Sequence, residues 1–151
     1  MKLGFLTDYS DERIRFAHTT GFDCLELRAQ PDSALDKADW IQVKSTLDEY
    51  GITVSALTCY INHLEEGKEE EQEKYFSQIL QNASLLNCNV VATLTGCTAA
   101  SQQSGKIEDS LNAFENIFNR HALTAEDNGV RIAFENWPGG HPWPLMKNIA
   151  I

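Results

Sequence analysis

Two glutamates stand where a carboxylate could do chemistry. Glu135 closes the run VRIAFE at residues 130–135, in which apolar residues alternate with the others. Successive side chains of a strand point to opposite faces, so Glu135 points away from the apolar face. Glu26 has the same place in CLELR, residues 24–28. If the sheet curls into a barrel, both carboxylates project toward its axis, where they could bind a divalent cation or move protons.

Each glutamate also has a purely structural interpretation. For Glu26 it is a buried ion pair with Arg28 or Arg131, because a buried charge needs a partner. Glu135 lies at the exit of its strand and is followed by a polar and then an aromatic residue. This position favours a functional role for Glu135.

Two histidines and a tryptophan occupy loops that follow strand-like runs. His63 comes after the run 52–60 and could serve as a ligand, a proton shuttle or a hydroxyl-binding group, although a lone loop histidine is usually just solvated. Trp137 and His141 lie in WPGGHPWP, residues 137–144. Aromatic faces suit the apolar side of a sugar ring, so we expect both to contact substrate; local packing is the alternative.

Strand-like and helix-like segments alternate along the whole chain. Alternation and helical spacing predict strands at residues 2–8, 24–29, 52–60, 89–96 and 130–134, and helices at 11–20, 40–50, 75–86 and 107–127. His18 and His121 fall within helices and are expected to be structural. The order predicts an α/β fold of about five βα units around a parallel sheet.

The joints between these segments differ in length. Each predicted helix ends on a residue suited to a left-handed cap, namely Gly21, Gly51, Asn87 and Gly129. The joints from strand to helix are long, and long loops at one end of a parallel sheet are where such folds keep their chemistry.

Composition and charge exclude several classes of partner. The chain has 151 residues, 42% of them hydrophobic, and a formal net charge of −10. That charge opposes binding to nucleic acid or an anionic membrane, and no apolar run is long enough to span a bilayer. With no secretory signal at the N-terminus, we expect a cytoplasmic protein. The acidic run at residues 65–71 is predicted to be a solvated helix start.

The cysteines are Cys24, Cys59, Cys88 and Cys97, and they form no CxxC pair. We expect reduced, buried thiols, with an approach of Cys59 to Cys97 at adjacent strand ends as the alternative.

Four segments together resemble one known family. They are FDCLEL at residues 22–27, Asn62 with His63, LLNCNVV at residues 85–91, and AEDNGVRIAFEN at residues 125–136. In order and spacing they are similar to the sugar phosphate isomerase/epimerase family of xylose-isomerase-like (β/α)8 TIM barrels. The resemblance spans essentially the whole chain.

The resemblance implies roles for particular residues. In that family the glutamate ending strand five, here Glu135, is a ligand of a divalent metal, typically Mn, Mg, Co or Zn, and in the epimerase branch it also takes part in proton transfer at a carbon next to a carbonyl. The histidine after strand three, here His63, is a substrate or metal contact, and Glu26 faces the same cavity. The implied mechanism is polarisation of a ketose or aldose oxygen by the metal, followed by an enediolate or hydride shift.

A complete barrel of this kind needs about 250 residues. The family's other ligands, an Asp, a His and a second Glu, come from strands six to eight. Residues 1–151 are therefore expected to be the N-terminal part of a single TIM-barrel domain, inactive alone. Exposed edges on the first and fifth strands predict a homodimer that covers them.

Two other functions remain in view. One is a non-catalytic binding or scaffold domain that keeps the fold. The other is the family's endonuclease branch, which holds zinc with histidines after strands three and four. In this sequence the predicted fourth strand ends without a histidine. The net charge of −10 also opposes binding to DNA.

Overall fold

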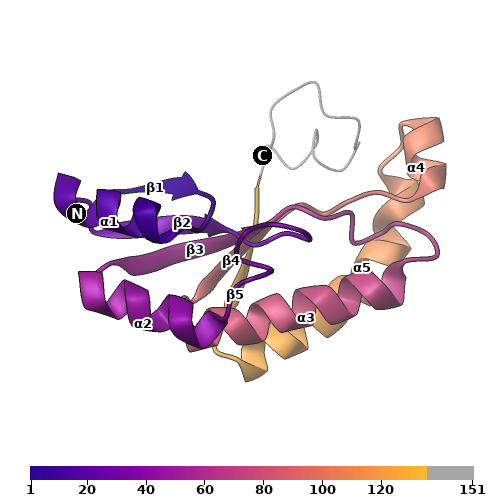
Figure 1. Cartoon of the computed structure of the whole chain (residues 1–151). Coiled ribbons are helices and arrows are strands. Elements are labelled where there is room, and N and C mark those ends of the chain that lie inside the picture. Colours follow the sequence, from indigo (N-terminus) through magenta and orange to yellow (C-terminus); the bar gives the residue numbers. More distant parts are fainter. Residues whose placement is uncertain (136–151) are drawn as a thin grey trace.

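The five predicted strands form one parallel sheet in sequence order (Figure 1). The computed structural model describes residues 1–135. The strands are β1 (Gly4–Thr7), β2 (Cys24–Arg28), β3 (Thr53–Cys59), β4 (Val90–Thr93) and β5 (Arg131–Phe134). The helices are α1 (Asp11–Thr20), α2 (Trp40–Tyr50), α3 (Glu69–Leu85), α4 (Ala99–Ser104) and α5 (Glu108–Asp127). The prediction of about five parallel βα units is confirmed.

The predicted helix ends are also confirmed. All four cap residues have positive φ, from 55° at Asn87 to 83° at Gly21. Gly21 donates its backbone N–H to the carbonyl of His18, which satisfies an acceptor at the end of α1. The acidic run at residues 65–71 is mostly exposed, and its last three glutamates form the first turn of α3, where the helix dipole favours carboxylates.

Helix α4 was not predicted, because its residues AASQQS show no apolar spacing. Thr98 caps the N-terminus of the helix, and its hydroxyl accepts from the backbone N–H of Ser101 at 3.2 Å. Thr98 is held in turn by Ser110 at the start of α5, 3.1 Å between the two hydroxyls. Tertiary contacts, more than local propensity, thus hold this short helix.

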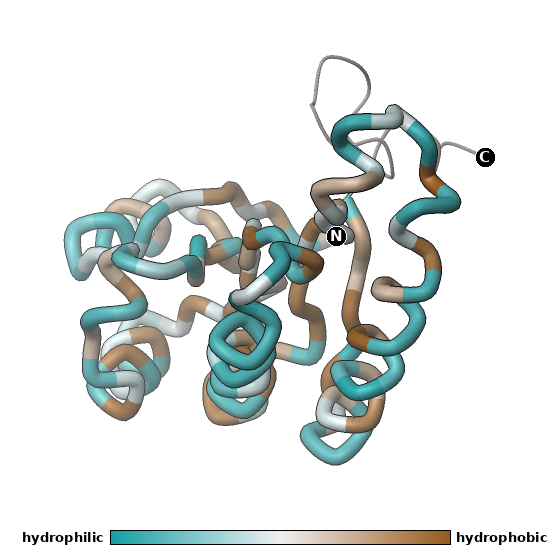
Figure 2. The backbone as a smooth tube through the Cα atoms, turned by 90° about the vertical axis from the view of Figure 1, so that its right-hand side faces the viewer, coloured by the Kyte–Doolittle hydropathy of each residue, from teal (hydrophilic) through white to brown (hydrophobic). Residues whose placement is uncertain are grey.

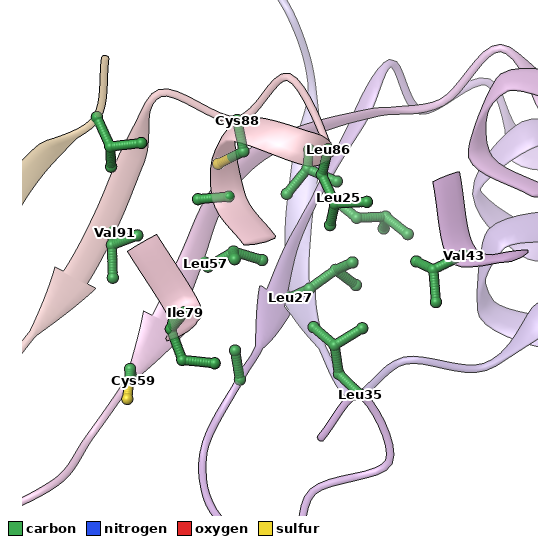
Figure 3. Close-up of a cluster of buried hydrophobic side chains, with 14 of the residues drawn as sticks. Leu25, Leu27, Leu35, Val43, Leu57, Cys59, Ile79, Leu86, Cys88 and Val91 are labelled. Carbon is green, nitrogen blue, oxygen red and sulfur yellow. The ribbon is translucent and has the colours of Figure 1, made fainter. Parts of the chain in front are cut away.

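The main core lies between the sheet and the helices. Leu25 and Leu27 of β2, Leu57 of β3 and Val91 of β4 meet Ile79 of α3 in this layer (Figure 3). Helices α2, α3 and α5 lie in a row along one face of the sheet, and each alternates hydrophilic and hydrophobic segments (Figures 1 and 2). One stripe of each helix is therefore buried while the other faces solvent.

The other face of the sheet carries no helix within residues 1–135 (Figure 1). Because Leu25 and Leu27 face the core, the intervening Glu26 and the following Arg28 face this helix-free side. None of the helices in that part of the chain is both long and apolar enough to cross a membrane.

Candidate functional site

Glu135 directly follows β5 at the carboxyl end of the sheet. Its backbone N–H donates to the carbonyl oxygen of Thr93 at 3.0 Å, which extends the pairing of β4 with β5 by one residue. Phe134 and Ile132 pack toward α5, so alternation directs Glu135 to the helix-free face. The glutamate is half-buried. The structure thus holds its backbone firmly at the rim of the sheet.

Glu26 lies on the same face, in the middle of β2. It pairs in register with Ala56 of β3 and accepts a hydrogen bond from the hydroxyl of Thr58. The structural alternative, an ion pair with arginine, is not seen in residues 1–135. Arg28 instead binds Asp8 at 3.1 Å, so the cation is held at the end of β1. Glu26 therefore keeps a polar partner without being neutralised by a cation.

The two glutamates are not neighbours in the sheet. Strands β3 and β4 separate β2 from β5, and three strand spacings amount to about 14 Å. Two ligands of one metal ion must lie far closer than that. Residues 1–135 contain no group of three or more His, Cys, Asp or Glu side chains that could hold a metal ion. The described chain therefore offers single carboxylates and no complete metal cage.

His63 lies at the predicted place after β3, but its side chain is buried in the layer between sheet and helices. It is 0% exposed and packs against Phe76 of α3 and Phe118 of α5, with ring centroids 4.6 and 4.9 Å away. Its Nε2 lies 2.8 Å from the hydroxyl of Thr93, and its Nδ1 lies 3.2 Å from Nε2 of His121. Burial, followed by the effect of His121, lowers the pKa of His63 to about 3. Both ring nitrogens are thus engaged inside the protein.

Asn62 joins the loops that follow β3 and β4, a role that we did not predict. Its side-chain oxygen accepts from the backbone N–H of Cys97 at 2.9 Å, and its side-chain NH2 donates to the carbonyl of Cys97 at 3.1 Å. The same oxygen also accepts from the N–H of Leu64. The side-chain amide therefore pairs with the backbone of Cys97 as a neighbouring strand would, and it connects the loops that follow β3 and β4. Its only sequence signal is a polar amide directly after an apolar run.

Trp137 and His141, the predicted substrate contacts, lie outside the described residues. The four cysteines are buried and free, as predicted, and no disulfide joins Cys59 to Cys97. Burial raises the pKa of Cys59 to about 12.

A cavity in residues 1–135 lies away from the rim that carries Glu135. Its volume is about 720 Å3, and it lies between α5 and β5, where its lining includes Phe114, Phe118, Ile132 and Phe134 as well as Glu126 and Arg131. Phe134 is 39% exposed there. Most of its lining residues are apolar, as is typical of a surface against which another element packs.

The chain superposes on solved structures that share its fold. A D-tagatose 3-epimerase-like protein superposes with a TM-score of 0.75 at 16% identity, covering 99% of this chain and 61% of that one. D-psicose 3-epimerase from Clostridium cellulolyticum, solved with D-tagatose, gives 0.66 at 16% identity over 87% of this chain and 51% of that one. The IOLI protein, solved with a zinc atom, gives 0.62 at 18% identity over 89% and 51%.

The chain thus spans between 51% and 61% of the length of these three proteins. At such identities the likeness shows the fold. A comparison with curated proteins gives no match. The family model described as xylose isomerase-like TIM barrel, however, matches residues 14–147, nearly the whole chain. With five parallel strands and alternating helices in the order that such a barrel requires, the chain belongs to the xylose isomerase-like TIM barrel family.

Proposed function

We propose that this chain carries part of the active site of a divalent-metal-dependent sugar or sugar phosphate isomerase or epimerase. The observation that supports this most is the position of Glu135, at the carboxyl end of β5 on the helix-free face, in a chain of the xylose isomerase-like family. Chemistry in parallel βα barrels takes place at the carboxyl ends of the strands.

In this proposal Glu135 is one metal ligand and also moves a proton at the carbon next to the substrate carbonyl. A bound Mn, Mg, Co or Zn ion would polarise an oxygen of the ketose or aldose. Residues 1–135 form no complete cage, so the other ligands come from outside them. Glu26, Trp137 and His141 are proposed to contact the sugar. The backbone N–H bond to Thr93 fixes the strand from which the Glu135 carboxylate projects.

We assign His63 a positioning role in this site. Its nitrogens are occupied by Thr93 and His121, so a direct contact to metal or sugar would require the ring to leave its pair. Because His63 follows Asn62, which holds the loop after β4, a fixed His63 helps to keep the two loops in place.

A titration with Mn2+ followed by NMR tests this function on the 151-residue chain. The paramagnetic ion broadens nearby amide signals, so it locates even weak binding. We expect selective broadening around residues 133–135 and at the end of β4, and its loss in Glu135→Gln. Glu12→Gln, an exposed change on α1, is the matched control and should keep the broadening. Equal broadening in wild type and Glu135→Gln would refute the role of Glu135.

The second candidate is a non-catalytic binding or scaffold domain. The lack of a three-ligand group within residues 1–135 favours it. In that case Mn2+ would broaden no amides selectively in any of the three proteins. The titration therefore separates the two functions.

A homodimer and a cytoplasmic location stay predictions. In the described sheet, β1 and β5 are the edge strands, and the groove beside β5 adds apolar surface to that edge. A light-scattering mass equal to that of the monomer at tens of micromolar protein would argue against the dimer.

A further inference from the structure

Two histidines far apart in sequence form a buried pair beneath the carboxyl end of the sheet. His63 follows β3 and His121 lies in α5, 58 positions later. The rings are 0% and 1% exposed, and Phe76 and Phe118 pack around them. Buried histidines are costly unless their nitrogens are satisfied, so the directions of their hydrogen bonds matter.

The contacts of Thr93 determine those directions. Its hydroxyl lies 2.6 Å from the carbonyl oxygen of Cys59, which can only accept, so the hydroxyl proton is donated there. The same oxygen must then accept from Nε2–H of His63, 2.8 Å away. In a neutral imidazole the other nitrogen is a bare acceptor, so Nδ1 of His63 accepts from Nε2–H of His121 at 3.2 Å. Both rings therefore carry their proton on Nε2.

This chain of bonds ends at Nδ1 of His121, which is buried and has no hydrogen-bond partner among the described residues. A proton added there would place a charge in an apolar pocket. A proton added to Nδ1 of His63 would instead face the N–H of His121 and break the bond between the rings. Either protonation opposes the packed arrangement.

Charged groups around the pair do not neutralise an added proton. Glu73 on α3 attracts a charge on His121, but its carboxylate already binds Arg120 of α5 through two bonds of 2.8 Å. Arg120 repels the same charge. Burial lowers the pKa of His121 to about 4, with Glu73 opposing and Arg120 reinforcing that effect. On the side of β4, the pair contacts Thr93, which is uncharged.

The pair lies where the main core, which includes Phe76, meets a separate, smaller core, which includes Phe118. The main core includes β2, β3, β4 and α3, whereas Leu64, Ile117 and Phe118 form a second cluster with Phe114 and Ile132 around it. The N-terminal half of α5 rests on that second cluster. Ile132 of β5 contacts both clusters, while Ala125 near the end of α5 and Val130 just before β5 belong to the main core. A small cluster offers less resistance to local opening than the main core does.

We propose that the His63–His121 pair is an acid-sensitive latch that fastens α5 and β5 to the rest of the sheet. At neutral pH the pair is uncharged and closed. When the pH falls, protonation of the pair opens it, and α5 with β5 loosens while β2 and β3 stay packed. The latch needs neither a metal ion nor the Glu135 carboxylate, so its test does not depend on the proposed sugar chemistry, although Glu135 follows β5 and His63 also positions the loops of the proposed site.

The direction of the pH effect follows from the two pKa values. Both are lower in the closed state than the ordinary value of 6.5. The latch therefore has its full strength above pH 6.5 and weakens as the pH falls toward about 4, the pKa of His121 in the closed state. Each histidine contributes up to about tenfold in the opening equilibrium per pH unit within this window.

Two measurements on the 151-residue chain test the proposal. Long-range 1H–15N NMR of the histidine rings at pH 7.5 should show the Nε2–H tautomer for both residues, and a pH titration should show pKa values well below 6.5. Hydrogen exchange at pH 5 and pH 7, corrected for the intrinsic rate, should show protection lost at residues 108–134 before residues 24–28 and 53–59. An Nδ1–H tautomer of His63, an ordinary pKa for either ring, or uniform loss across the sheet would overturn the latch.

His121→Gln supplies the test by substitution, because its amide can still donate to His63 but cannot take up a proton. We expect α5 to stay protected to a pH lower by about one unit or more. His18→Gln, an exposed histidine of α1, is the control and should leave the acid response unchanged. An unchanged response in a folded His121→Gln would overturn the proposal, and if this variant fails to fold, the wild-type tautomers and pKa values decide.

Discussion

Gly96 packs directly against the side chain of Asn62. A β-carbon at position 96 would overlap the amide oxygen of Asn62 and lie 2.9 Å from the backbone nitrogen of His63. The backbone of Gly96 also has φ of +77°, which side chains rarely adopt. Two loops of the functional end therefore meet at a point where only a residue without a side chain fits.

We predict that Gly96→Ala destabilises the protein more than Gly105→Ala does. Both glycines have positive φ, +77° and +71°, but a β-carbon at Gly105 meets nothing within 4 Å. The change at Gly105 should cost about 1 kcal/mol of backbone strain. At Gly96 the displaced Asn62 amide should add about 1–3 kcal/mol. Urea unfolding of both variants measures the difference, and equal losses would contradict the close contact.

We predict that Thr93→Val lowers the free energy of unfolding by about 1–3 kcal/mol, although valine has nearly the same shape. Stability is lost because valine has no hydroxyl, so the carbonyl of Cys59 and Nε2–H of His63 would each lose a hydrogen-bond partner. Thr46→Val is the control, because that hydroxyl bonds the carbonyl of Gln42 within its own helix. Chemical denaturation of the two variants checks this. A Thr93→Val protein as stable as wild type would mean that the hydroxyl bonds contribute little.

We predict that all four thiols of the folded protein are slow to react with a disulfide reagent at pH 8. The thiolate is the reactive form, and burial raises the pKa of Cys59 to about 12 and also raises those of Cys88 and Cys97. Cys24 is protected by its burial. The absorbance of the thiol that the reagent releases should show four rapidly reacting cysteines only after the protein is unfolded. A fast thiol in the folded state would place that cysteine at a more open position.

The fold was predictable to a large extent because its signals are local. Alternation in CLELR and VRIAFE predicted β2 and β5, since period-two patterns need only the residues of one strand. The caps at Gly21 and Gly51 needed only the local preference for positive φ. Helix α4 was missed because it depends on Thr98 and Ser110, which tertiary structure brings together.

The site was less predictable because its partners are distant in sequence. Asn62 meets Cys97 across 35 positions, and His63 meets His121 across 58. His121 was expected to be structural, and it is buried as that expectation requires; its pairing with His63 had no signal in the sequence.

The sequence by itself determined the order of the strands and of every described helix except α4, and the face on which Glu26 and Glu135 lie, because alternation along a strand fixes the side of each residue. Only the tertiary structure decided where His63 points. Alternation holds only as far as the strand pairing continues, which includes Glu135 through its bond to Thr93 but not His63 in its loop. The side chain of His63 is therefore directed by the groups that satisfy it, Thr93 of β4 and His121 of α5.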